Sequence, residues 1–138
     1  MIDTKPYFFN PEIIPLLEKK YKVKYVCETC IKSNGYWRNH PSLIFYSEKA
    51  HPEGSNYLAV SMQNNSLLLS NGISAIEPFT GIEADNGEII YSRFRHDFRT
   101  SSDKSVSIDG GRDYTRMLGD TTPKSVTLQI VKDEVVKI

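Results

Sequence analysis

Residues 56–72 read NYLAVSMQNNSLLLSNG, and this stretch decides the fold class. It contains two short runs rich in apolar residues and β-formers, 56–62 and 66–70, which predict strands. Asn71-Gly72 follows the second run, and another pair, Asn86-Gly87, also lies between apolar runs. An Asn-Gly pair favours a two-residue β-hairpin because both central positions of that turn need positive φ. We therefore expect hairpins at both pairs.

The sequence on either side continues the same pattern. Residues 22–27 and 42–47 predict two more strands. The apolar alternation within 125–138 predicts closing strands, with a bend at Asp133-Glu134. The expected fold class is mainly β (α+β), an antiparallel sheet or small barrel with β-hairpins and one N-terminal helix.

That helix is predicted from its start. Asn10-Pro11-Glu12 is a typical helix N-terminus, because Asn caps free N–H groups and Pro at the first helical position loses no hydrogen bond. We expect the helix to run to about Lys20. Its apolar residues are expected to face the core, and they are Ile13, Ile14, Leu16 and Leu17.

Length and composition limit the possibilities. With 138 residues and 39% hydrophobic content, the chain can bury one core of ordinary size, so we expect a single domain over residues 1–138. Its 17 basic and 17 acidic residues cancel, so no overall field draws the protein to nucleic acid or to an anionic membrane. The apolar runs are far shorter than the roughly 20 residues of a membrane-spanning helix, and the N-terminus lacks the features of a secretory signal. We expect no membrane partner and a cytoplasmic location.

The two cysteines, Cys27 and Cys30, form one CxxC motif. No second pair completes a tetrahedral zinc site, and a reducing cytosol disfavours a structural disulfide. A thioredoxin-like redox pair needs the motif at a helix start, whereas the next residues, 31–35, indicate a turn. Half of a metal site and a redox pair are both alternatives. We interpret the pair as unmodified thiols at the end of a strand, and we expect no metal and no cofactor.

One polar segment carries the candidate chemistry. Residues 93–99 read RFRHDFR and residues 109–116 read DGGRDYTR, which gathers arginines, aspartates and a histidine in a short span. As a strand, the first run would place two of its arginines and Asp97 on one face, and His96 with two phenylalanines on the other. We therefore expect His96 to lie among aromatic side chains.

His96 has two interpretations. A histidine beside phenylalanines is more often a core or turn residue that donates to a backbone carbonyl than a general base. As a catalytic acid or base it needs a carboxylate partner, which Asp97 or Asp109 would supply. A phosphodiester hydrolase would then use Arg112 and Arg116 to stabilise the charge that develops on phosphate.

The Asp109-Gly110-Gly111 sequence predicts a turn, because glycine adopts backbone conformations closed to other residues. Such a turn can also form a nest of backbone N–H groups that holds an anion, with Arg112 and Arg116 as bidentate phosphate donors. Surface salt bridges to Asp97, Asp103 and Asp113 explain the same arginines equally well.

Nine residues within 83–116 follow a distinctive spacing without gaps: Gly87, His96, Asp97, Phe98, Asp109, Gly110, Gly111, Tyr114 and Arg116. In this spacing the segment resembles a family of short proteins of unknown function, common in bacteriophages. The family pattern is C-x-x-C-G, then His-Asp-Phe, then C-x-C, then Asp-Gly-Gly-x-x-Tyr-x-Arg. The resemblance implies a phage or prophage setting, and hence the cytoplasm of a host cell. It also implies that the 96–97 pair and the 109–116 run lie side by side, but it implies no reaction.

The resemblance breaks at the four cysteine positions of the family. At these positions this chain has Glu83, Asn86, Ser101 and Asp103. A thiolate zinc site is therefore impossible, and we expect a zinc-less, knuckle-like hairpin segment at about 83–116. The Asn86-Gly87 turn and the apolar pair Ile89-Ile90 would replace what the metal contributes to stability. An alternative is a Mg²⁺ or Ca²⁺ site with oxygen ligands from positions 83, 101 and 103.

We expect a non-enzymatic binding protein whose ligand carries a phosphate, such as a nucleotide. In a phage setting it would sequester a signal of host defence or dock on a host protein. An arginine-dense segment in an otherwise neutral chain motivates this hypothesis, together with aromatic residues able to stack on a base. The predicted ligand-binding residues are Arg95, Gly110, Gly111, Arg112, Tyr114, Arg116 and Trp37.

Two alternatives stay open from the residues alone. One is a phosphodiester hydrolase or nuclease that uses His96, Asp97 and Asp109. The other is a structural or protein-interaction domain in which the polar groups form solvated turns, with Trp37 as a half-buried cover of a sheet edge. Exposed strand edges would also permit a homo-oligomer.

Overall fold

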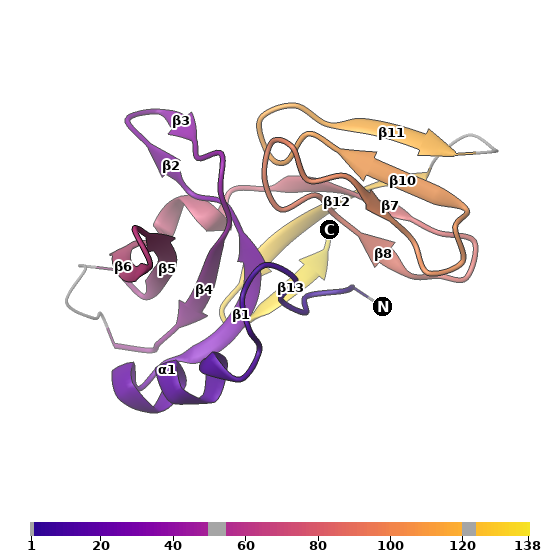
Figure 1. Ribbon diagram of the computed structural model, residues 1–138. Coiled ribbons are helices and arrows are strands. Elements are labelled where there is room, and N and C mark those ends of the chain that lie inside the picture. The colour runs from indigo at the N-terminus through magenta and orange to yellow at the C-terminus, as the bar shows by residue number, and fades with distance from the viewer. Residues whose placement is uncertain (1, 50–54, 120–123) are drawn as a thin grey trace.

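The computed structural model describes residues 2–49, 55–119 and 124–138, and this part of the chain is mainly β (Figure 1). Its strands pair antiparallel in three larger sheets and one small hairpin. One α-helix, α1 (Ile13–Tyr21), and one 3-10 helix, η1 (Ile73–Ile76), accompany them. The expected fold class is confirmed. Neither helical segment in the described ranges has the length and apolarity needed to cross a bilayer.

The first sheet has four strands, each within two residues of its expected range. They are β1 (Lys24–Thr29), β4 (Ser42–Tyr46), β5 (Tyr57–Gln63) and β6 (Ser66–Asn71), in the order β1-β4-β5-β6. Helix α1 packs against one face of this sheet. The buried cluster between them includes Leu17, Leu43, Phe45, Leu58 and Val60.

Helix α1 begins two residues after the expected start at Pro11. Asn10 still organises the first turn, because its Oδ1 atom accepts a hydrogen bond from the Glu12 N–H at 3.0 Å. Leu17 is buried, but Leu16 is 69% exposed, so the expectation that Leu16 faces the core is wrong. Successive helical residues point about 100° apart, and only one of the two leucines can face the sheet.

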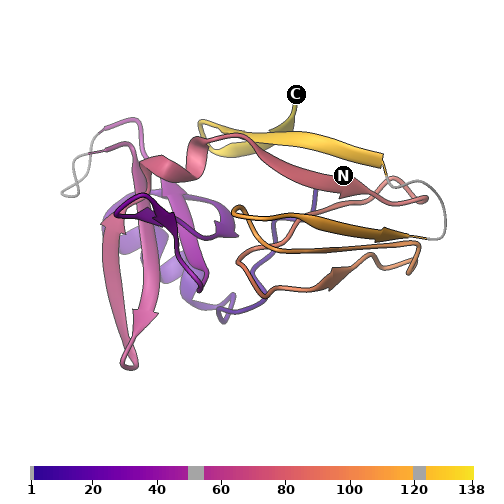
Figure 2. The same cartoon turned by 90° about the horizontal axis from the view of Figure 1, so that it is seen from above.

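The second half of the molecule consists of two β layers (Figure 2). Its strands are β7 (Phe79–Glu83), β8 (Ile89–Ile90), β9 (Arg99–Thr100), β10 (Val106–Asp109), β11 (Arg116–Gly119), β12 (Lys124–Val131) and β13 (Glu134–Lys137). One layer has the order β13-β12-β7-β8, and the other has the order β11-β10-β9. A buried cluster between the layers contains Ile82, Ala84, Ile90, Val106 and Ile108.

A third buried cluster joins the two halves. It includes Ile44 from the first sheet together with Phe79 and Leu128 from the second half. The small hairpin of β2 (Lys32–Ser33) and β3 (Tyr36–Trp37) projects from the first sheet toward the loop that precedes β11 (Figures 1 and 2). This junction positions the candidate site.

The two Asn-Gly pairs have different outcomes. Asn86-Gly87 lies in the turn between β7 and β8, so the hairpin is confirmed, but not as a two-residue turn: Gly87 has positive φ and Asn86 does not, and the Ala84 N–H donates to the Glu88 carbonyl oxygen. The hairpin predicted at Asn71-Gly72 is wrong, because the Asn71 Oδ1 atom accepts a hydrogen bond from the Ile73 N–H at 2.8 Å and η1 begins there. The hairpin of this region lies earlier, at Asn64-Asn65, where both residues have positive φ. Asn is enriched in this conformation but is a weaker signal than Gly.

Candidate functional site

The turn Asp109-Gly110-Gly111 is fixed by close packing. Both glycines have positive φ, 103° at Gly110 and 63° at Gly111. A Cβ atom on Gly110 would lie 1.4 Å from the Tyr114 carbonyl oxygen, and one on Gly111 would lie 2.5 Å from the Phe94 carbonyl carbon. The predicted turn is confirmed, and its glycines allow the backbone to press against the preceding polar run.

This contact brings the two polar runs together. The Gly111 N–H donates to the Ser92 Oγ atom at 2.9 Å, and the Ser92 hydroxyl donates to the Asp97 carbonyl oxygen at 2.6 Å. Residues 96–97 therefore lie beside the 109–116 run, as the resemblance implied. One N–H group of the glycine turn is used inside the protein, so fewer donors are left for an anion.

Residues 93–98 form a turn and not the expected strand. The Asp97 N–H donates to the Phe94 carbonyl oxygen at 3.0 Å, which closes the turn. Arg93 is fully buried while Arg95 is exposed, so the two do not share a face. His96 is also exposed, and the expectation that it lies among aromatic side chains is wrong. A tight turn does not alternate its side chains between two faces as a strand does.

Arg112 uses its side chain inside the protein. Its Nη1 atom donates to the Ala75 carbonyl oxygen at 2.9 Å, and its Nη2 atom donates to the Glu77 carbonyl oxygen. The guanidinium carbon lies 4.5 Å from the Trp37 ring centroid and 4.4 Å from the Phe79 ring centroid. Burial lowers the pKa of the Arg112 guanidinium from its ordinary value. Arg112 thus ties the glycine turn to η1 and to the β2–β3 hairpin.

Two tyrosines that neighbour this contact in the chain are exposed. Tyr36, next to Trp37, is 79% exposed, and Tyr114, two residues after Arg112, is 62% exposed. Trp37 itself is half-buried, and the Lys32 Nζ atom lies 5.0 Å from its ring centroid. We call Tyr36, Trp37, Arg112 and Tyr114 the aromatic face. Three of these four were predicted ligand-binding residues, and the fold brings two of them, Trp37 and Arg112, into contact from distant parts of the chain.

Two other arginines of the segment pair with aspartates. The Arg99 Nε atom lies 2.9 Å from the Asp97 Oδ2 atom, and the Arg116 Nη2 atom lies 3.4 Å from the Asp109 Oδ2 atom. Arg116 is therefore in a salt bridge, although with Asp109 and not with Asp97, Asp103 or Asp113, whereas Arg112 donates to backbone carbonyls. Arg95 is exposed, and it has no ion pair within the described ranges.

The candidate catalytic residues His96, Asp97 and Asp109 do not form a histidine–carboxylate pair. Asp97 is buried, and its Oδ2 atom also accepts the Arg93 N–H at 2.7 Å. In the part of the chain that the structure describes, His96 makes no hydrogen bond or ion pair with Asp97 or Asp109. The same part contains no cluster of His, Cys, Asp or Glu that could hold a metal ion.

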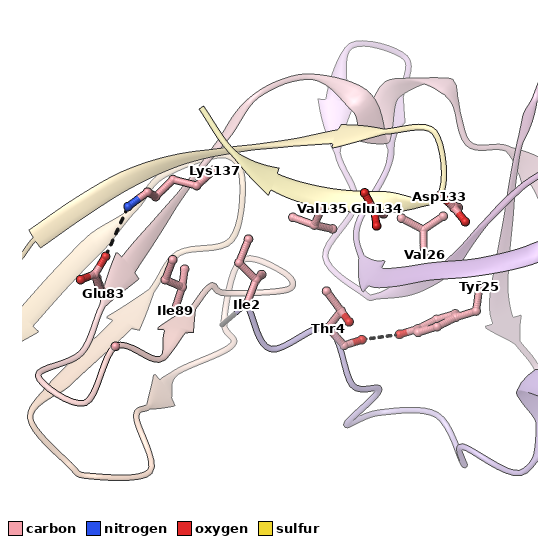
Figure 3. A pocket seen from close by; sticks show the side chains of 11 residues that line it. Ile2, Thr4, Tyr25, Val26, Glu83, Ile89, Asp133, Glu134, Val135 and Lys137 are labelled. Atoms are coloured by element: carbon pink, nitrogen blue, oxygen red, sulfur yellow. Dashed lines mark hydrogen bonds and ion pairs between the residues drawn. The ribbon is translucent and has the colours of Figure 1, made fainter.

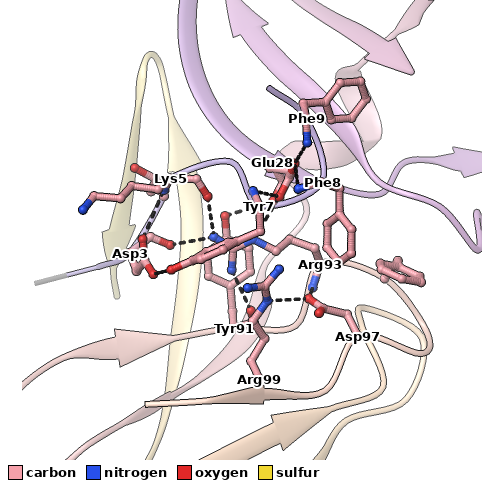
Figure 4. A network of polar contacts seen from close by, with 12 residues as sticks. Asp3, Lys5, Tyr7, Phe8, Phe9, Glu28, Tyr91, Arg93, Asp97 and Arg99 are labelled. Carbon is pink, nitrogen blue, oxygen red and sulfur yellow. Dashed lines mark hydrogen bonds and ion pairs between the residues drawn. The ribbon is translucent and has the colours of Figure 1, made fainter. Parts of the chain in front are cut away.

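Arg93 lies at the centre of a buried polar network (Figure 4). Its Nη1 atom donates to the Tyr91 carbonyl oxygen at 3.0 Å. Its Nη2 atom donates to the carbonyl oxygens of Lys5, at 2.9 Å, and Asp3, at 3.2 Å. Its Nε atom lies 3.4 Å from the Glu28 Oε1 atom. These partners compensate the loss of hydration of a buried charge.

Glu28 completes this network from strand β1. Its Oε1 atom accepts the Tyr7 N–H at 2.8 Å, and its Oε2 atom accepts the N–H groups of Phe8, at 3.0 Å, and Phe9, at 3.2 Å. Sequence reasoning missed Glu28, because it lies inside the CxxC motif just beyond the predicted end of the strand. The network fastens the N-terminal segment to both halves of the molecule.

The Asp103 carboxylate joins two turns. Asp103 occupies one of the positions where the resembling family has a cysteine. The Asp103 Oδ1 atom accepts hydrogen bonds from the Ser101 hydroxyl at 2.6 Å and the Ser105 N–H at 2.9 Å. Its Oδ2 atom accepts the Asn86 N–H at 3.0 Å. These bonds, the Ser101 hydroxyl first, lower the pKa of Asp103 to about 2. Hydrogen bonds to Asp103 thus connect the 83–88 hairpin to the 101–105 turn.

A hollow of about 700 Å³ lies between the N-terminal segment, β1, β8 and β13 (Figure 3). Its charged groups are mostly paired, because Glu83 lies 3.6 Å from the Lys137 Nζ atom and Asp133 lies 2.8 Å from the Lys24 Nζ atom. None of the predicted catalytic or phosphate-ligand-binding residues lines this hollow. The candidate site therefore stays at the aromatic face.

Cys27 and Cys30 are free and buried, which agrees with their interpretation as unmodified thiols. Burial raises the pKa of the Cys27 thiol to about 12, and burial also raises the pKa of Cys30. A thiol with a raised pKa forms little thiolate at neutral pH and is a poor nucleophile.

One family model matches the region that contains the glycine turn. It is a domain of unknown function, DUF7695. The match spans residues 87–119, from the β7–β8 turn to the end of β11, and covers less than half of the chain. The expected resemblance to a family of unknown function is confirmed at this level. No curated protein and no solved structure matches the chain.

Proposed function

We propose that this chain is a non-enzymatic binding module that docks on another protein through the aromatic face. The observation that carries the proposal is the contact between Trp37 and Arg112, whose chain neighbours Tyr36 and Tyr114 are 79% and 62% exposed. Trp, Tyr and Arg are the residues that most often dominate the binding energy of protein interfaces.

The contacts of Arg112 also favour docking. Its two hydrogen bonds to backbone carbonyls hold the turn that carries Tyr114 before any partner arrives. An ordered surface loses less conformational entropy on binding, so more of the contact energy appears as affinity. The chain has no net charge, which favours a protein partner over the phosphate backbone of nucleic acid.

The phage setting implied by the sequence resemblance suggests where this docking takes place. The partner would be a host protein in the host cytoplasm, and binding would serve evasion of host defence. A hydrolase is less well supported, because His96 is exposed and Asp97 and Asp109 are each paired with an arginine. General acid–base chemistry needs a histidine that a neighbouring group orients.

Photo-cross-linking tests the docking proposal. A photoreactive phenylalanine analogue is placed at Tyr36 or Tyr114, and at Leu16 as a control that is 69% exposed on α1. We expect the two tyrosine positions to give a discrete adduct in an extract of the host cell, and Leu16 to give none. Excess unlabelled wild-type chain should abolish the adduct.

The competition step decides whether the aromatic face is responsible. The Tyr36→Ala/Tyr114→Ala double variant should compete poorly, whereas Leu16→Ala should compete as well as wild type. Equal competition by the two variants, or equal cross-linking from Leu16, would reject the aromatic face as the docking surface.

A phosphate-bearing ligand such as a nucleotide is a second candidate, supported by Arg95. This arginine is exposed, has no ion pair within the described ranges, and has a backbone that touches Gly111. It lies on the same turn as His96, and the glycine turn that its backbone meets leads to the exposed Tyr114, which offers a ring for a base to stack on. The Arg112 Nη1 and Nη2 atoms already donate to backbone carbonyls, so Arg95 and Arg116 would carry the phosphate contacts.

A thermal-shift panel of nucleotides and inorganic phosphate tests this second candidate. A ligand at ~100 times its dissociation constant adds roughly 2.7 kcal/mol of stability. The shift should disappear in Arg95→Ala and persist in Lys19→Ala, which removes an exposed cation on α1. Chromatography of the recovered ligand separates sequestration, which returns it unchanged, from hydrolysis. No shift with any ligand would leave protein docking as the proposed function.

A further inference from the structure

Strand β6 is an outer strand with an unusual composition. Among the described residues it pairs with β5 alone, which leaves its other edge open. Its sequence, Ser-Leu-Leu-Leu-Ser-Asn, contains no charged residue. Leu67 is 46% exposed and Leu68 is 37% exposed. An open, apolar and uncharged edge is a template for pairing with another strand.

The other outer strands of the three larger sheets are protected. β1, β9, β11 and β13 each contain at least one charged residue, which disfavours pairing between copies. β8 is uncharged, but Ile2 forms a bridge with Ile89 and covers its edge. Of the outer strands of the three larger sheets in the described ranges, β6 is thus the one without either protection.

The β5–β6 hairpin indicates which backbone groups face the open edge. A two-residue turn at Asn64-Asn65 makes the first pair, at Ser66, a hydrogen-bonded pair. Pairs alternate along an antiparallel ladder, so Leu68 is again bonded to β5. The N–H and C=O groups of Leu67 and Leu69 therefore point toward the open edge.

We propose that β6 pairs antiparallel with β6 of a second copy of this chain, about a twofold axis at Leu68. The strand is symmetric about that residue, since 66–70 read Ser-Leu-Leu-Leu-Ser. In this register Leu67 lies opposite Leu69 of the second copy, and their outward backbone groups bond to each other. Leu68 lies opposite Leu68 of the second copy, and these two residues form a pair without hydrogen bonds. A twofold contact needs a self-complementary surface, and this strand provides one.

The consequence for the assembly is a continuous sheet. The two four-stranded sheets, each in the order β1-β4-β5-β6, join through their β6 edges. Both sets of exposed leucines are then covered by leucines of the other copy, with no charge opposite them. This inference does not depend on the proposed function, because the aromatic face takes no part in the contact.

Sedimentation analysis tests the dimer. The wild-type chain should sediment as a dimer, and Leu68→Lys should be a monomer, because it places two like charges opposite each other at the twofold axis. Leu118→Lys is the matched control, since Leu118 is 46% exposed on the outer strand β11. This control should remain dimeric.

A cysteine variant tests the register. Opposed residues of a pair without hydrogen bonds have Cα atoms about 4.5 Å apart, which is within the range of a disulfide. Mild oxidation of Leu68→Cys should therefore give a covalent dimer on a non-reducing gel. Leu67→Cys, on the same strand but opposite Leu69, should give little. The native Cys27 and Cys30 are buried and do not compete.

Three results would overturn the proposal. They are a wild-type chain that stays monomeric at high concentration, a Leu68→Lys variant that stays dimeric, and equal cross-linking of the two cysteine variants. The Tyr36→Ala/Tyr114→Ala variant should dimerise normally, so a failure of the docking proposal is distinguishable from a failure of the dimer.

Discussion

Gly111 shows how a single missing atom allows the glycine turn to form. Its φ is 63°, and a Cβ atom there would meet the backbone of Phe94 at 2.5 Å. Backbone cannot move aside as a flexible side chain can. We expect Gly111→Ala to lower the free energy of unfolding by about 2 to 5 kcal/mol, from conformational strain and overpacking together. Chemical denaturation measures this loss.

Gly35→Ala is the control for the strain alone. Gly35 has a φ of 83°, but no other atom lies within 4 Å of its would-be Cβ atom. The expected loss is only about 1 kcal/mol. If the two alanine variants lost the same stability, close packing of the glycine turn would not be the reason for Gly111.

Glu28 is a second single residue on which the fold depends, because its buried carboxylate interacts with four partners. Its removal leaves the Arg93 charge buried without its ion pair, and three N–H groups without an acceptor. We expect Glu28→Ala to cost about 3 to 5 kcal/mol in the free energy of unfolding. Glu77→Ala breaks the partly exposed Lys32–Glu77 pair and should cost less than about 1 kcal/mol. A similar cost for both variants in denaturant titrations would contradict the role of burial.

Asp103 acts at the level of elements, because it joins two turns. Its pKa is lowered from 3.8 to about 2, first by the Ser101 hydroxyl and then by Ser105. A folded-state pKa below the unfolded value gives stability that is fully present above about pH 4 and is lost as the pH falls toward 2. The difference in Tm between wild type and Asp103→Asn should therefore shrink between pH 4 and pH 2. A difference that stays constant through this window would argue against the carboxylate.

Arg112 connects the glycine turn to the β2–β3 hairpin, and Trp37 reports on that connection. Trp37 is the one tryptophan of the chain, and its ring lies 4.5 Å from the Arg112 guanidinium carbon. We expect Arg112→Met to shift the tryptophan emission to the red, because the hairpin loosens and the ring meets more water. Arg116→Met should leave the emission unchanged, since Arg116 pairs with Asp109 and not with the hairpin. Identical emission spectra for Arg112→Met and wild type would show that Arg112 does not hold the hairpin to the glycine turn.

The elements also show what local sequence can and cannot predict. Strands of the first sheet were predictable because a two-residue period and β-branched or aromatic residues are local signals. The turn at 93–98 was not, because the Phe94–Asp97 hydrogen bond competes with an equally good strand pattern. Asn71-Gly72 has the composition of a hairpin turn, but the Asn71 side chain accepts the Ile73 N–H and starts η1 instead.

At the scale of the whole molecule, two arginines of the dense segment connect distant parts of the chain. Arg93 and Arg112 reach across the chain to Glu28, Ala75 and neighbouring carbonyl groups, and such distant partners leave no trace in local sequence. Trp37, Gly111 and Tyr114 were predicted as ligand-binding residues, because aromatic residues and paired glycines are conspicuous in a sequence. The contact between Trp37 and Arg112 could not be predicted, because the two residues are far apart in the chain.

The buried thiols have a consequence for how this chain responds to its surroundings. Cys27 belongs to the cluster that joins the two halves, and its raised pKa leaves almost no thiolate at neutral pH. A thiol reagent can therefore react with Cys27 only when that junction opens, and the labelling rate reports how often it opens. We expect thiol labelling to be slow in wild type and faster in Glu28→Ala, in which the buried polar network is broken. The labelling rate of the buried cysteines then measures how often the two halves of the molecule separate.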